Sequence, residues 1–352
     1  MKMRIVSGCL AACLLLTALF FGGCRQSGMK RYQAESLLYF DTVTTVIGYA
    51  ESREAFDREA AAIFGELAEY HQLFDIYNAY EGIANLYTVN EVISGAHCTV
   101  TVDRRIIDLL LFAREMYAKT AGALNIGMGS VLSIWHAHRE AAKKDPTAAT
   151  VPSDAALAAA AAHTALDALL IDEVNNTVTI TDPQMTLDVG AVAKGFAAER
   201  VAEAMAARGL THYLLNVGGT VRAVGCRADG KAWTVGIEQP DTQALSPYLA
   251  ELSLTDKALA TSGTYQRYYT ANGVRYHHII DVKTSKPADG YLSLSVLADN
   301  AALADALSTA LFCMSVEEGI ALLEGYPDAA ALWVRTDGTQ YKSARFDEFL
   351  KK

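Results

Sequence analysis

The sequence predicts an α+β fold in which a central, largely antiparallel sheet has helices packed outside it. Helical patterns dominate the first half of the chain, whereas strand patterns separated by short turns dominate from Leu169 onwards. Two further helical patterns follow near the C-terminus, and this segregation of helices from strands is typical of α+β folds. We expect the functional site in a cleft between the N-terminal helical part and the sheet. Three pairs of turn-forming residues separate the strand patterns, as tight hairpins require. They are Asn-Asn at 175–176, Asp-Gly at 229–230 and Asn-Gly at 272–273.

The N-terminus has the parts of a secretory signal followed by a cysteine. Lys2 and Arg4 are basic, residues 5–21 are apolar, and two glycines precede Cys24. This pattern predicts a lipoprotein signal peptide over residues 1–23 and attachment of lipid, diacylglycerol and palmitate, at Cys24. A retained membrane anchor is the alternative. No later segment approaches the roughly 18 apolar residues of a spanning helix, so we expect a lipid-anchored protein on the extracytoplasmic face of a bacterial cell membrane.

Residues 24–36 are expected to form a polar tether, followed by one folded domain over residues 37–352. Within this domain, alternating apolar residues predict strands, and apolar residues three and four positions apart predict amphipathic helices. Ser153 and Gly209 are candidate helix caps. The expected strands include residues 38–49, 177–181 and 274–279, and the expected helices are residues 53–73, 104–120, 130–144, 153–163, 196–208, 303–314 and 316–323.

Composition limits the classes of function. A net charge of −10 and a pI of about 5.3 argue against nucleic-acid binding and against adhesion to membranes through a basic patch. The eight histidines and six cysteines form no H-E-x-x-H or C-x-x-C pattern, so a zinc site has no support. Beyond Cys24, the spacing of Cys98, Cys226 and Cys313 indicates buried free thiols rather than a disulfide framework.

Residues 276–287 place imidazole, carboxylate and ammonium groups at the end of one apolar strand. The alternation that follows the hairpin turn at residues 272–273 puts His278 on the same strand face as Tyr276. His278 is therefore a candidate for acid-base work, with Asp281 either orienting it or serving in its place. A histidine at the edge of the core beside a surface ion pair is the simpler alternative.

Residues 187–195, with the sequence LDVGAVAKG, lead from a strand and a short loop into the N-terminus of a helix. A turn of small residues at such a position lets backbone N–H groups approach an anion, and Lys194 adds a positive charge. This segment is therefore a candidate phosphate-binding loop. Glycines that only allow close packing of the helix on the strand are the alternative.

Asp305 and Thr309 lie four residues apart in an otherwise apolar helical segment, so their side-chain oxygens share one helix face. Carboxylate and hydroxyl oxygens, with a backbone carbonyl and substrate phosphates, are ligands that Mg²⁺ takes. Burying an unpaired carboxylate is costly, which favours a metal site over a solvated face. In the loop region after the first helix, Tyr77, Tyr80 and Tyr87 either stack on a ligand ring or pack within the protein.

Together these segments resemble the ApbE family, the FAD:protein FMN transferases, over essentially everything after about Leu37. Residues 73–77 and 122–129 also resemble family elements. The chain departs from the family pattern at Asn125, Val282, Ser285 and residues 40–42, which affects ring and ribityl contacts but leaves the metal and phosphate positions intact. The five ordered motifs are D-x-G-x-x-A-K-G at 188–195, L-x-N-x-G-G at 214–219, T-S-G-x-Y at 261–265, H-I-I-D at 278–281 and D-A-x-x-T at 305–309.

The resemblance implies an ApbE-like fold and Mg²⁺-dependent transfer of FMN from FAD to a Thr or Ser hydroxyl of an acceptor flavoprotein subunit, with release of AMP. It implies that Asp305 and Thr309 bind Mg²⁺ through their side chains and Ala191 through its carbonyl. Asp188 would hold polar groups of FAD, and Lys194 would hold its phosphates. The other cofactor-binding positions implied are Phe40, Tyr77, Ala123, Leu124, Asn125 and His278.

Two other functions would use the same residues. A Mg²⁺-dependent FAD pyrophosphatase would transfer the FMN phosphorus to water and release FMN and AMP. A non-catalytic flavin-binding lipoprotein would store or deliver FAD, but the joint presence of His278, Asp305 and Thr309 favours chemistry. In every case the negative chain repels an anionic dinucleotide at long range, so Lys194 and a divalent metal have to supply local positive charge.

Overall fold

The structure is a computed structural model that describes residues 28–93, 99–241 and 244–352. The predicted signal peptide, Cys24 and Cys98 lie outside these residues. Cys226 and Cys313 are free thiols, and each is partly exposed. No helix in the described part of the chain is long and apolar enough to cross a membrane.

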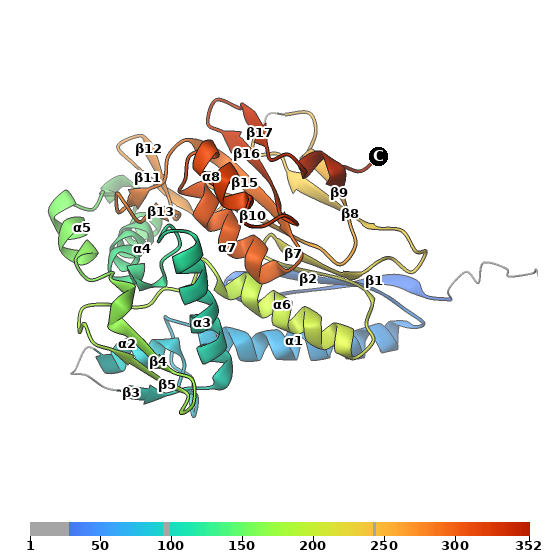
Figure 1. Cartoon of the computed structure of the whole chain (residues 1–352), viewed down its shortest axis with the longest axis horizontal. Coiled ribbons are helices and arrows are strands. Elements are labelled where there is room, and N and C mark those ends of the chain that lie inside the picture. The colour runs from blue at the N-terminus through green and yellow to red at the C-terminus, as the bar shows by residue number, and fades with distance from the viewer. Residues whose placement is uncertain (1–27, 94–98, 242–243) are drawn as a thin grey trace, which may run out of the picture.

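One eight-stranded sheet organises the fold, and every pair of neighbouring strands in it is antiparallel. The predicted α+β class with a largely antiparallel central sheet is therefore confirmed. The strand order is β1-β2-β6-β7-β10-β15-β16-β17, so β1 and β17 are the edges (Figure 1). The strands are Lys30–Tyr39 (β1), Thr42–Ala50 (β2), His212–Val217 (β6), Thr220–Gly225 (β7), Ala258–Gly263 (β10), Tyr291–Ala298 (β15), Ala330–Arg335 (β16) and Gln340–Lys342 (β17).

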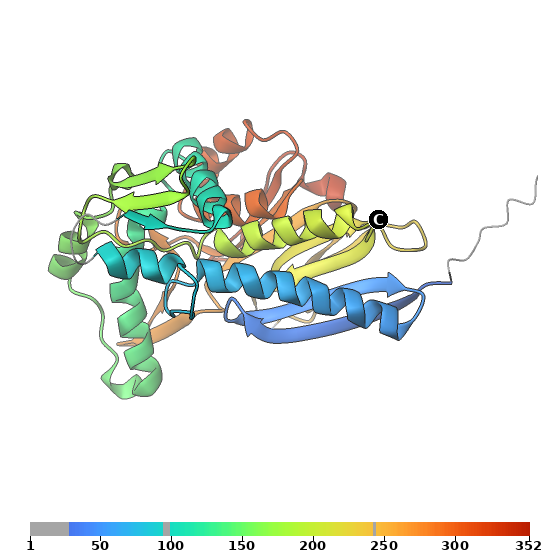
Figure 2. The same cartoon turned by 90° about the horizontal axis from the view of Figure 1, so that it is seen from below.

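The two faces of this sheet are covered by different elements. Helices α1 (Arg53–Phe74), α6 (Ala193–Ala207) and α7 (Ala301–Phe312) pack on one face, where α1 and α6 lie side by side (Figure 2). A hairpin of β8 (Trp233–Glu238) and β9 (Tyr248–Leu254) covers the other face over a second apolar core. Because both faces are covered, β15 is buried along nearly its whole length rather than at alternate positions.

The remaining elements lie around these layers. Helices α2 and α3 pack beside a three-stranded sheet of order β3-β5-β4, while α4 packs against α5 and the hairpin of β11 and β12 (Figure 1). The helices are Leu86–Ile93 (α2), Arg104–Lys119 (α3), Gly129–Lys144 (α4), Asp154–Ala161 (α5) and Val316–Leu323 (α8). The strands are Thr99–Thr101 (β3), Leu169–Asp172 (β4), Thr177–Ile180 (β5), Tyr268–Ala271 (β11), Val274–His277 (β12), Ile280–Asp281 (β13) and Lys286–Pro287 (β14).

Local sequence signals account for most helix ends. The side chains of Ser52, Ser153, Asn300 and Ser315 each accept a hydrogen bond from a backbone N–H in the first turn of a helix. Gly209, with φ of +82°, follows the last residues of α6 in the left-handed conformation that stops a helix. Each predicted helix is present within a few residues of its expected bounds.

Three features differ from the sequence expectation. The tether predicted over residues 24–36 is wrong from Lys30 onwards, because β1 begins there and Tyr32 and Ala34 pack against the core. Helix α2 has no predicted counterpart, since eight residues show too little of a helical repeat. The strand after the turn at residues 272–273 ends at His277, so His278 lies in a bend beyond the strand face that carries Tyr276.

Candidate active site

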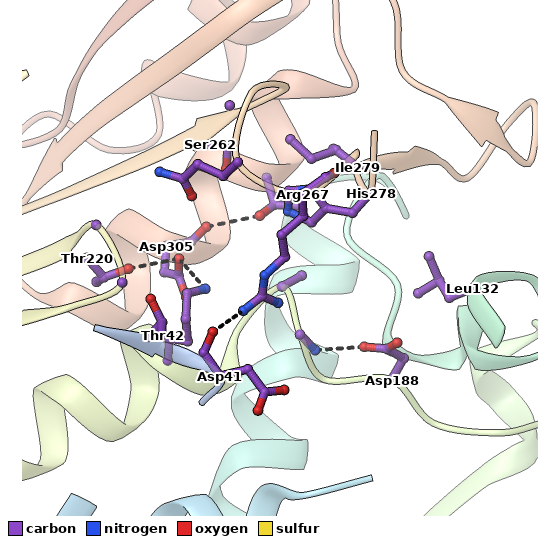
Figure 3. A pocket seen from close by; sticks show the side chains of 18 of the residues that line it. Asp41, Thr42, Leu132, Asp188, Thr220, Ser262, Arg267, His278, Ile279 and Asp305 are labelled. Carbon is purple, nitrogen blue, oxygen red and sulfur yellow. Dashed lines mark hydrogen bonds and ion pairs between the residues drawn. The ribbon is translucent and has the colours of Figure 1, made fainter. Parts of the chain in front are cut away.

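A cavity of about 940 Å³ opens at the end of the large sheet where β2 begins and β10 ends. Its walls come from the β1–β2 turn, the loop that leads into α6, helices α4 and α7, and the bend after β12 (Figure 3). A space of this size is in the range of pockets that hold cofactor-sized ligands. The three sequence segments singled out above therefore share one site. Their cavity-lining members are Asp188, Ala191, Lys194, His278, Asp305 and Thr309.

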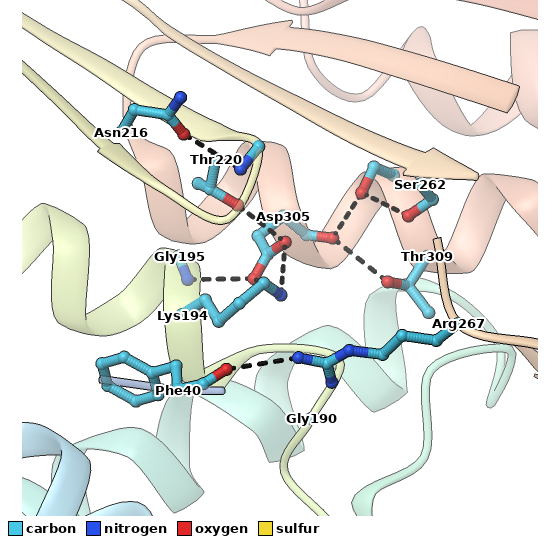
Figure 4. Close-up of polar contacts among 12 residues, drawn as sticks. Phe40, Gly190, Lys194, Gly195, Asn216, Thr220, Ser262, Arg267, Asp305 and Thr309 are labelled. Carbon is cyan, nitrogen blue, oxygen red and sulfur yellow. Dashed lines mark hydrogen bonds and ion pairs between the residues drawn. The ribbon is translucent and has the colours of Figure 1, made fainter. Parts of the chain in front are cut away.

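The carboxylate of Asp305 is held by donors from three other residues. Its Oδ2 accepts from the Gly195 N–H at 2.9 Å and faces the Lys194 Nζ at 3.3 Å, and its Oδ1 accepts from the Thr220 hydroxyl at 3.1 Å (Figure 4). Asp305 is only 5% exposed. A carboxylate buried to this extent requires such compensation, so α6 and β7 together fix its position.

The residues predicted to bind a metal all line the cavity. Thr309 lies one turn after Asp305 on α7, and its Oγ1 donates to the Asp305 carbonyl at 3.4 Å. Ala191 lines the same cavity from the loop before α6. A carboxylate, a hydroxyl and a backbone carbonyl are hard donors suited to Mg²⁺. The Lys194 ammonium beside Asp305 marks this carboxylate as a position that accepts positive charge, so the donor set fits the ion.

Gly195 allows α6 and α7 to approach closely beside Asp305. A Cβ at this position would lie 2.4 Å from the Cβ of Asp305 and 2.5 Å from the carbonyl oxygen of Ala301. Glycine thus lets its own N–H reach the carboxylate, and a larger residue would push the helices apart. Gly195 thus serves close packing, the simpler alternative for this loop, and phosphate binding by the loop stays a prediction.

His278 lies in the bend after β12, where its ring is partly accessible from the cavity. Its Nδ1–H donates to the carbonyl oxygen of Arg267 at 3.2 Å, which leaves Nε2 as the proton acceptor of the ring. Burial of the ring, with the positive charges of Arg267 and Lys194, lowers the pKa of His278 from 6.5 to about 3. The imidazole is therefore neutral at physiological pH.

Asp188 lines the cavity well apart from Asp305 (Figure 3). Its Oδ1 accepts from the Gly190 N–H at 2.8 Å. Burial raises the pKa of this carboxyl group, and the Gly190 hydrogen bond and the charges of His136, Arg139 and Arg267 oppose that rise. The carboxyl groups of Asp188 and Asp305 thus have different surroundings, since that of Asp305 faces the ammonium group of Lys194.

Of the residues predicted to line the ring pocket, Tyr77 and the segment 123–125 border the cavity. Tyr77 is 52% exposed and stacks on His136 with ring centroids 5.0 Å apart. Asn125 accepts from the Gly127 N–H at 2.8 Å and donates to the Thr164 carbonyl at 2.9 Å. The aspartate of the family pattern could not make the second of these bonds, because a carboxylate has no proton to donate.

Phe40 was predicted to line the ring pocket, but its ring lies outside the cavity. The ring packs edge-on against His71, with centroids 5.5 Å apart. Phe40 has φ of +54°, and this left-handed turn directs its side chain towards α1. Only its carbonyl oxygen faces the site, where it accepts from the Arg267 guanidinium at 3.2 Å (Figure 4).

Asp281, the alternative catalytic residue, also lies outside this cavity. It pairs with Lys286 in the β13–β14 hairpin and lines a separate cavity of about 220 Å³. Its Oδ1 accepts from the Lys283 N–H at 2.8 Å. The bend at His278 separates the two side chains, so the geometry favours His278 over Asp281 as the acid-base group.

Arg267 and Thr220 belong to the site although sequence reasoning did not select them. The Arg267 guanidinium donates to the carbonyl oxygens of Phe40 and Asp41, each at 3.2 Å, and borders the cavity. Thr220 is 1% exposed and bonds Asp305. Both residues lie just beyond a motif in the sequence: Thr220 directly after L-x-N-x-G-G, and Arg267 two residues after T-S-G-x-Y. Including the residues that flank these motifs would have found both.

Comparison with known proteins assigns the chain to a family. The family model described as "ApbE family" matches residues 40–333. The chain is 32% identical over 271 residues to the FAD:protein FMN transferase of Vibrio cholerae, covering 76% of this chain and 77% of that protein. It is 31% identical over 330 residues to the FAD:protein FMN transferase of Treponema pallidum, covering 90% and 88% of the two chains.

Solved structures show the same fold. The ApbE protein of Thermotoga maritima superposes with a TM-score of 0.80 at 26% identity, over 92% of this chain and all of that one. The flavin transferase ApbE of Vibrio cholerae superposes with a TM-score of 0.74 at 24% identity. With the family model matching most of the described domain and relatives above 30% identity, the chain belongs to the ApbE family.

Proposed function

We propose that this protein is a flavin transferase that moves FMN from FAD to a Thr or Ser hydroxyl of an acceptor flavoprotein subunit and releases AMP. The observation that carries the proposal is the convergence of Asp305, Thr309, Lys194 and His278 on one cofactor-sized cavity. Its relatives from Vibrio cholerae and Treponema pallidum carry the name FAD:protein FMN transferase. Transfer of a phosphorus-containing group needs charge neutralisation, alignment and removal of a proton, and these residues supply groups for all three.

Asp305, Thr309 and the carbonyl of Ala191 would hold Mg²⁺. When bound, the ion would neutralise phosphate oxygens and increase the positive charge around the reacting phosphorus. Lys194 lies beside the same carboxylate and adds a fixed ammonium group to the cavity wall. In a chain of net charge −10, these local positive charges are what would bind an anionic dinucleotide.

His278 would receive the proton of the attacking hydroxyl at Nε2. The hydroxyl oxygen forms a bond to the FMN phosphorus, the bond from that phosphorus to the bridging oxygen of the pyrophosphate breaks, and AMP leaves. The Nδ1–H bond to the Arg267 carbonyl fixes the tautomer that this role requires. The lowered pKa of His278 keeps Nε2 unprotonated before the reaction.

The membrane location remains part of this proposal. A lipid on Cys24 would hold the domain at the extracytoplasmic face of the cell membrane, as the signal-like segment over residues 1–23 predicts.

A direct test is to incubate the purified full-length protein with FAD, Mg²⁺ and a candidate acceptor protein and to look for flavin fluorescence that remains on the acceptor in a denaturing gel. We expect labelling that excess EDTA abolishes. Free FMN and AMP without labelled protein would instead support a pyrophosphatase. FAD binding without cleavage would support a storage or delivery protein.

The variant Asp305→Ala tests the metal assignment. Loss of a carboxylate from a Mg²⁺ site should lower the transfer rate by about a hundredfold or more. Asp299→Ala is the matched control, because Asp299 is half-exposed and pairs with Lys257 at the start of the same helix. Labelling by Asp305→Ala at the rate of the control would show the metal assignment to be wrong.

A further inference from the structure

The end of β1 exposes two consecutive leucines. Leu37 and Leu38 are 73% and 74% exposed. The register between β1 and β2 shifts between Ser36 and Tyr39, so these leucines occupy a bulge, and the Leu38 N–H donates to the Ser36 hydroxyl at 3.3 Å. In a regular strand, neighbouring side chains point to opposite faces. A bulge redirects side chains, and bulges are common beside functional sites.

The bulge lies at the mouth of the cavity. Leu37 lines the cavity, and so does Val43, which is 49% exposed on the other side of the β1–β2 turn. Tyr77, which is 52% exposed, lines the cavity as well. An apolar surface that continues from the outside of the protein into a reaction cavity is a candidate contact for the macromolecule that must reach into it.

β1 is also an edge of the large sheet. Within the described residues it pairs only with β2, so the backbone groups along its outer side are not paired with another strand. An extended polypeptide can add to such an edge through main-chain hydrogen bonds, with side chains giving specificity. The cavity mouth therefore has both apolar contacts and a hydrogen-bonding edge that match an extended peptide.

We propose that the bulged end of β1, formed by Leu37 and Leu38 with Val43 and Tyr77 beside it, binds the segment of the acceptor protein that carries the target hydroxyl. The segment lies extended along the outer edge of β1 and places its hydroxyl in the cavity. This inference rests on the proposed function, because only a protein acceptor has a reason to occupy the mouth. It adds the surface by which that acceptor is recognised.

Leu38 gives the sharpest test, because it belongs to the bulge but does not line the cavity. The acceptor is defined operationally as the protein that the wild-type enzyme labels with flavin, purified in its unlabelled form. Leu38→Ser should raise the KM for this acceptor about tenfold or more, since burial of a leucine contributes strongly to binding. The value of kcat and the affinity for FAD should stay within about twofold of wild type.

Two variants serve as controls. Leu38→Met keeps an apolar side chain and should restore a KM close to wild type. Val174→Ser removes an apolar side chain that is 89% exposed in the turn between β4 and β5, and it should leave every parameter unchanged. An unchanged KM in Leu38→Ser, or a fall in kcat without a rise in KM, would overturn the docking surface.

Photo-crosslinking from position 38 in living cells gives an independent measurement. With a benzophenone amino acid in place of Leu38, we expect an adduct to a protein that carries covalent flavin fluorescence, and none from the same group at position 174. Adducts only to a second copy of this chain or to lipid would overturn the proposal. Failure of the wild-type enzyme to label any protein would instead overturn the proposed function, so the two failures are distinct.

Discussion

His278 and Asp188 border the same cavity, and burial moves their pKa values in opposite directions. The pKa of His278 falls to about 3, whereas that of Asp188 rises. In both cases burial disfavours the charged form of the side chain. The positive charge of Arg267 acts on both groups: it lowers the pKa of His278 further and opposes the rise in the pKa of Asp188. The result is a neutral imidazole with an accepting Nε2 in a cavity where Lys194 and Arg267 supply the positive charge.

His278→Asn separates binding from chemistry. Asparagine keeps a polar group of similar size, so the bend after β12 should persist. We expect FAD affinity within a few-fold of wild type and a transfer rate lowered by roughly 10² to 10⁴, the usual range for a general acid-base group. Equilibrium binding and single-turnover labelling measure the two quantities. A large loss of FAD affinity would make His278 a ligand-binding residue, and an unchanged rate would make it structural.

The lowered pKa of His278 also predicts how stability depends on pH. The folded pKa of about 3 lies below the ordinary 6.5, so the unfolded state binds more protons between these values. The contribution of this residue is therefore fully present above about pH 6.5 and is lost as pH falls towards 3. The free energy of unfolding should decline more steeply on acidification in wild type than in His278→Asn. Parallel curves from denaturant titrations would contradict the assignment.

At the scale of elements, the contact between α6 and α7 positions Asp305 and Lys194 in the cavity wall. Gly195 brings the helices together beside Asp305, and Glu199, one turn farther along α6, accepts from the Ala301 N–H at the start of α7. Glu199 is 3% exposed and pairs with Arg222 of β7 at 3.0 Å. The two helices and the sheet are thus joined by buried polar contacts on both sides of the carboxylate.

Gly195→Ala should disrupt this arrangement. The new methyl group would meet backbone and Cβ atoms at 2.4–2.5 Å, and neither can move without shifting a helix. We expect a loss of more than about 2 kcal/mol in the free energy of unfolding, together with a loss of transfer. Denaturant unfolding measures the first effect.

Gly65→Ala is the matched control for this variant. Gly65 lies inside α1 with no atom within 4 Å of a built Cβ, so alanine should stabilise the protein by about 0.5–1 kcal/mol. If the two variants had equal stability, the close approach at Gly195 would not be the constraint described.

Features with local causes were predictable from the sequence, and features set by tertiary contacts were not. Asp305 and Thr309 share a helix face by spacing alone, and the turn at Asn272 and Gly273 follows from two residues with positive φ. The placement of Asp281, by contrast, depends on how its hairpin folds back after the bend at His278. Arg267 likewise enters the site only because its loop crosses the β1–β2 turn, 226 residues away in sequence from Asp41.

At the scale of the whole molecule, the cationic side chains of the site lie in an acidic protein. The chain carries a net charge of −10, and the cavity is lined by the cationic side chains of Arg139, Lys194 and Arg267 together with four carboxyl groups. Long-range attraction of an anionic substrate is therefore weak, and binding depends on short-range contacts within the cavity.

Cys24→Ser tests the predicted anchor of the whole molecule. Thioether attachment of diacylglycerol needs the thiol, so the variant should accumulate as an unmodified precursor or a released form. Wild-type protein should partition into the detergent phase in a Triton X-114 separation, and the variant should move to the aqueous phase. Identical partitioning of the two proteins would exclude lipidation at Cys24.

If Cys24 carries the predicted lipid, the early start of β1 limits how far the domain can reach from a membrane. Lys30 follows Cys24 by six positions, a span of at most about 20 Å even when fully extended. From there the ten residues of β1 run roughly 30 Å to the mouth of the cavity. With a lipid on Cys24, β1 and the residues before it would keep the mouth of the cavity within about 50 Å of the bilayer. Acceptor hydroxyls held farther from the membrane than that would not be labelled. The distance of the target hydroxyl from the membrane would therefore help to determine which proteins receive flavin.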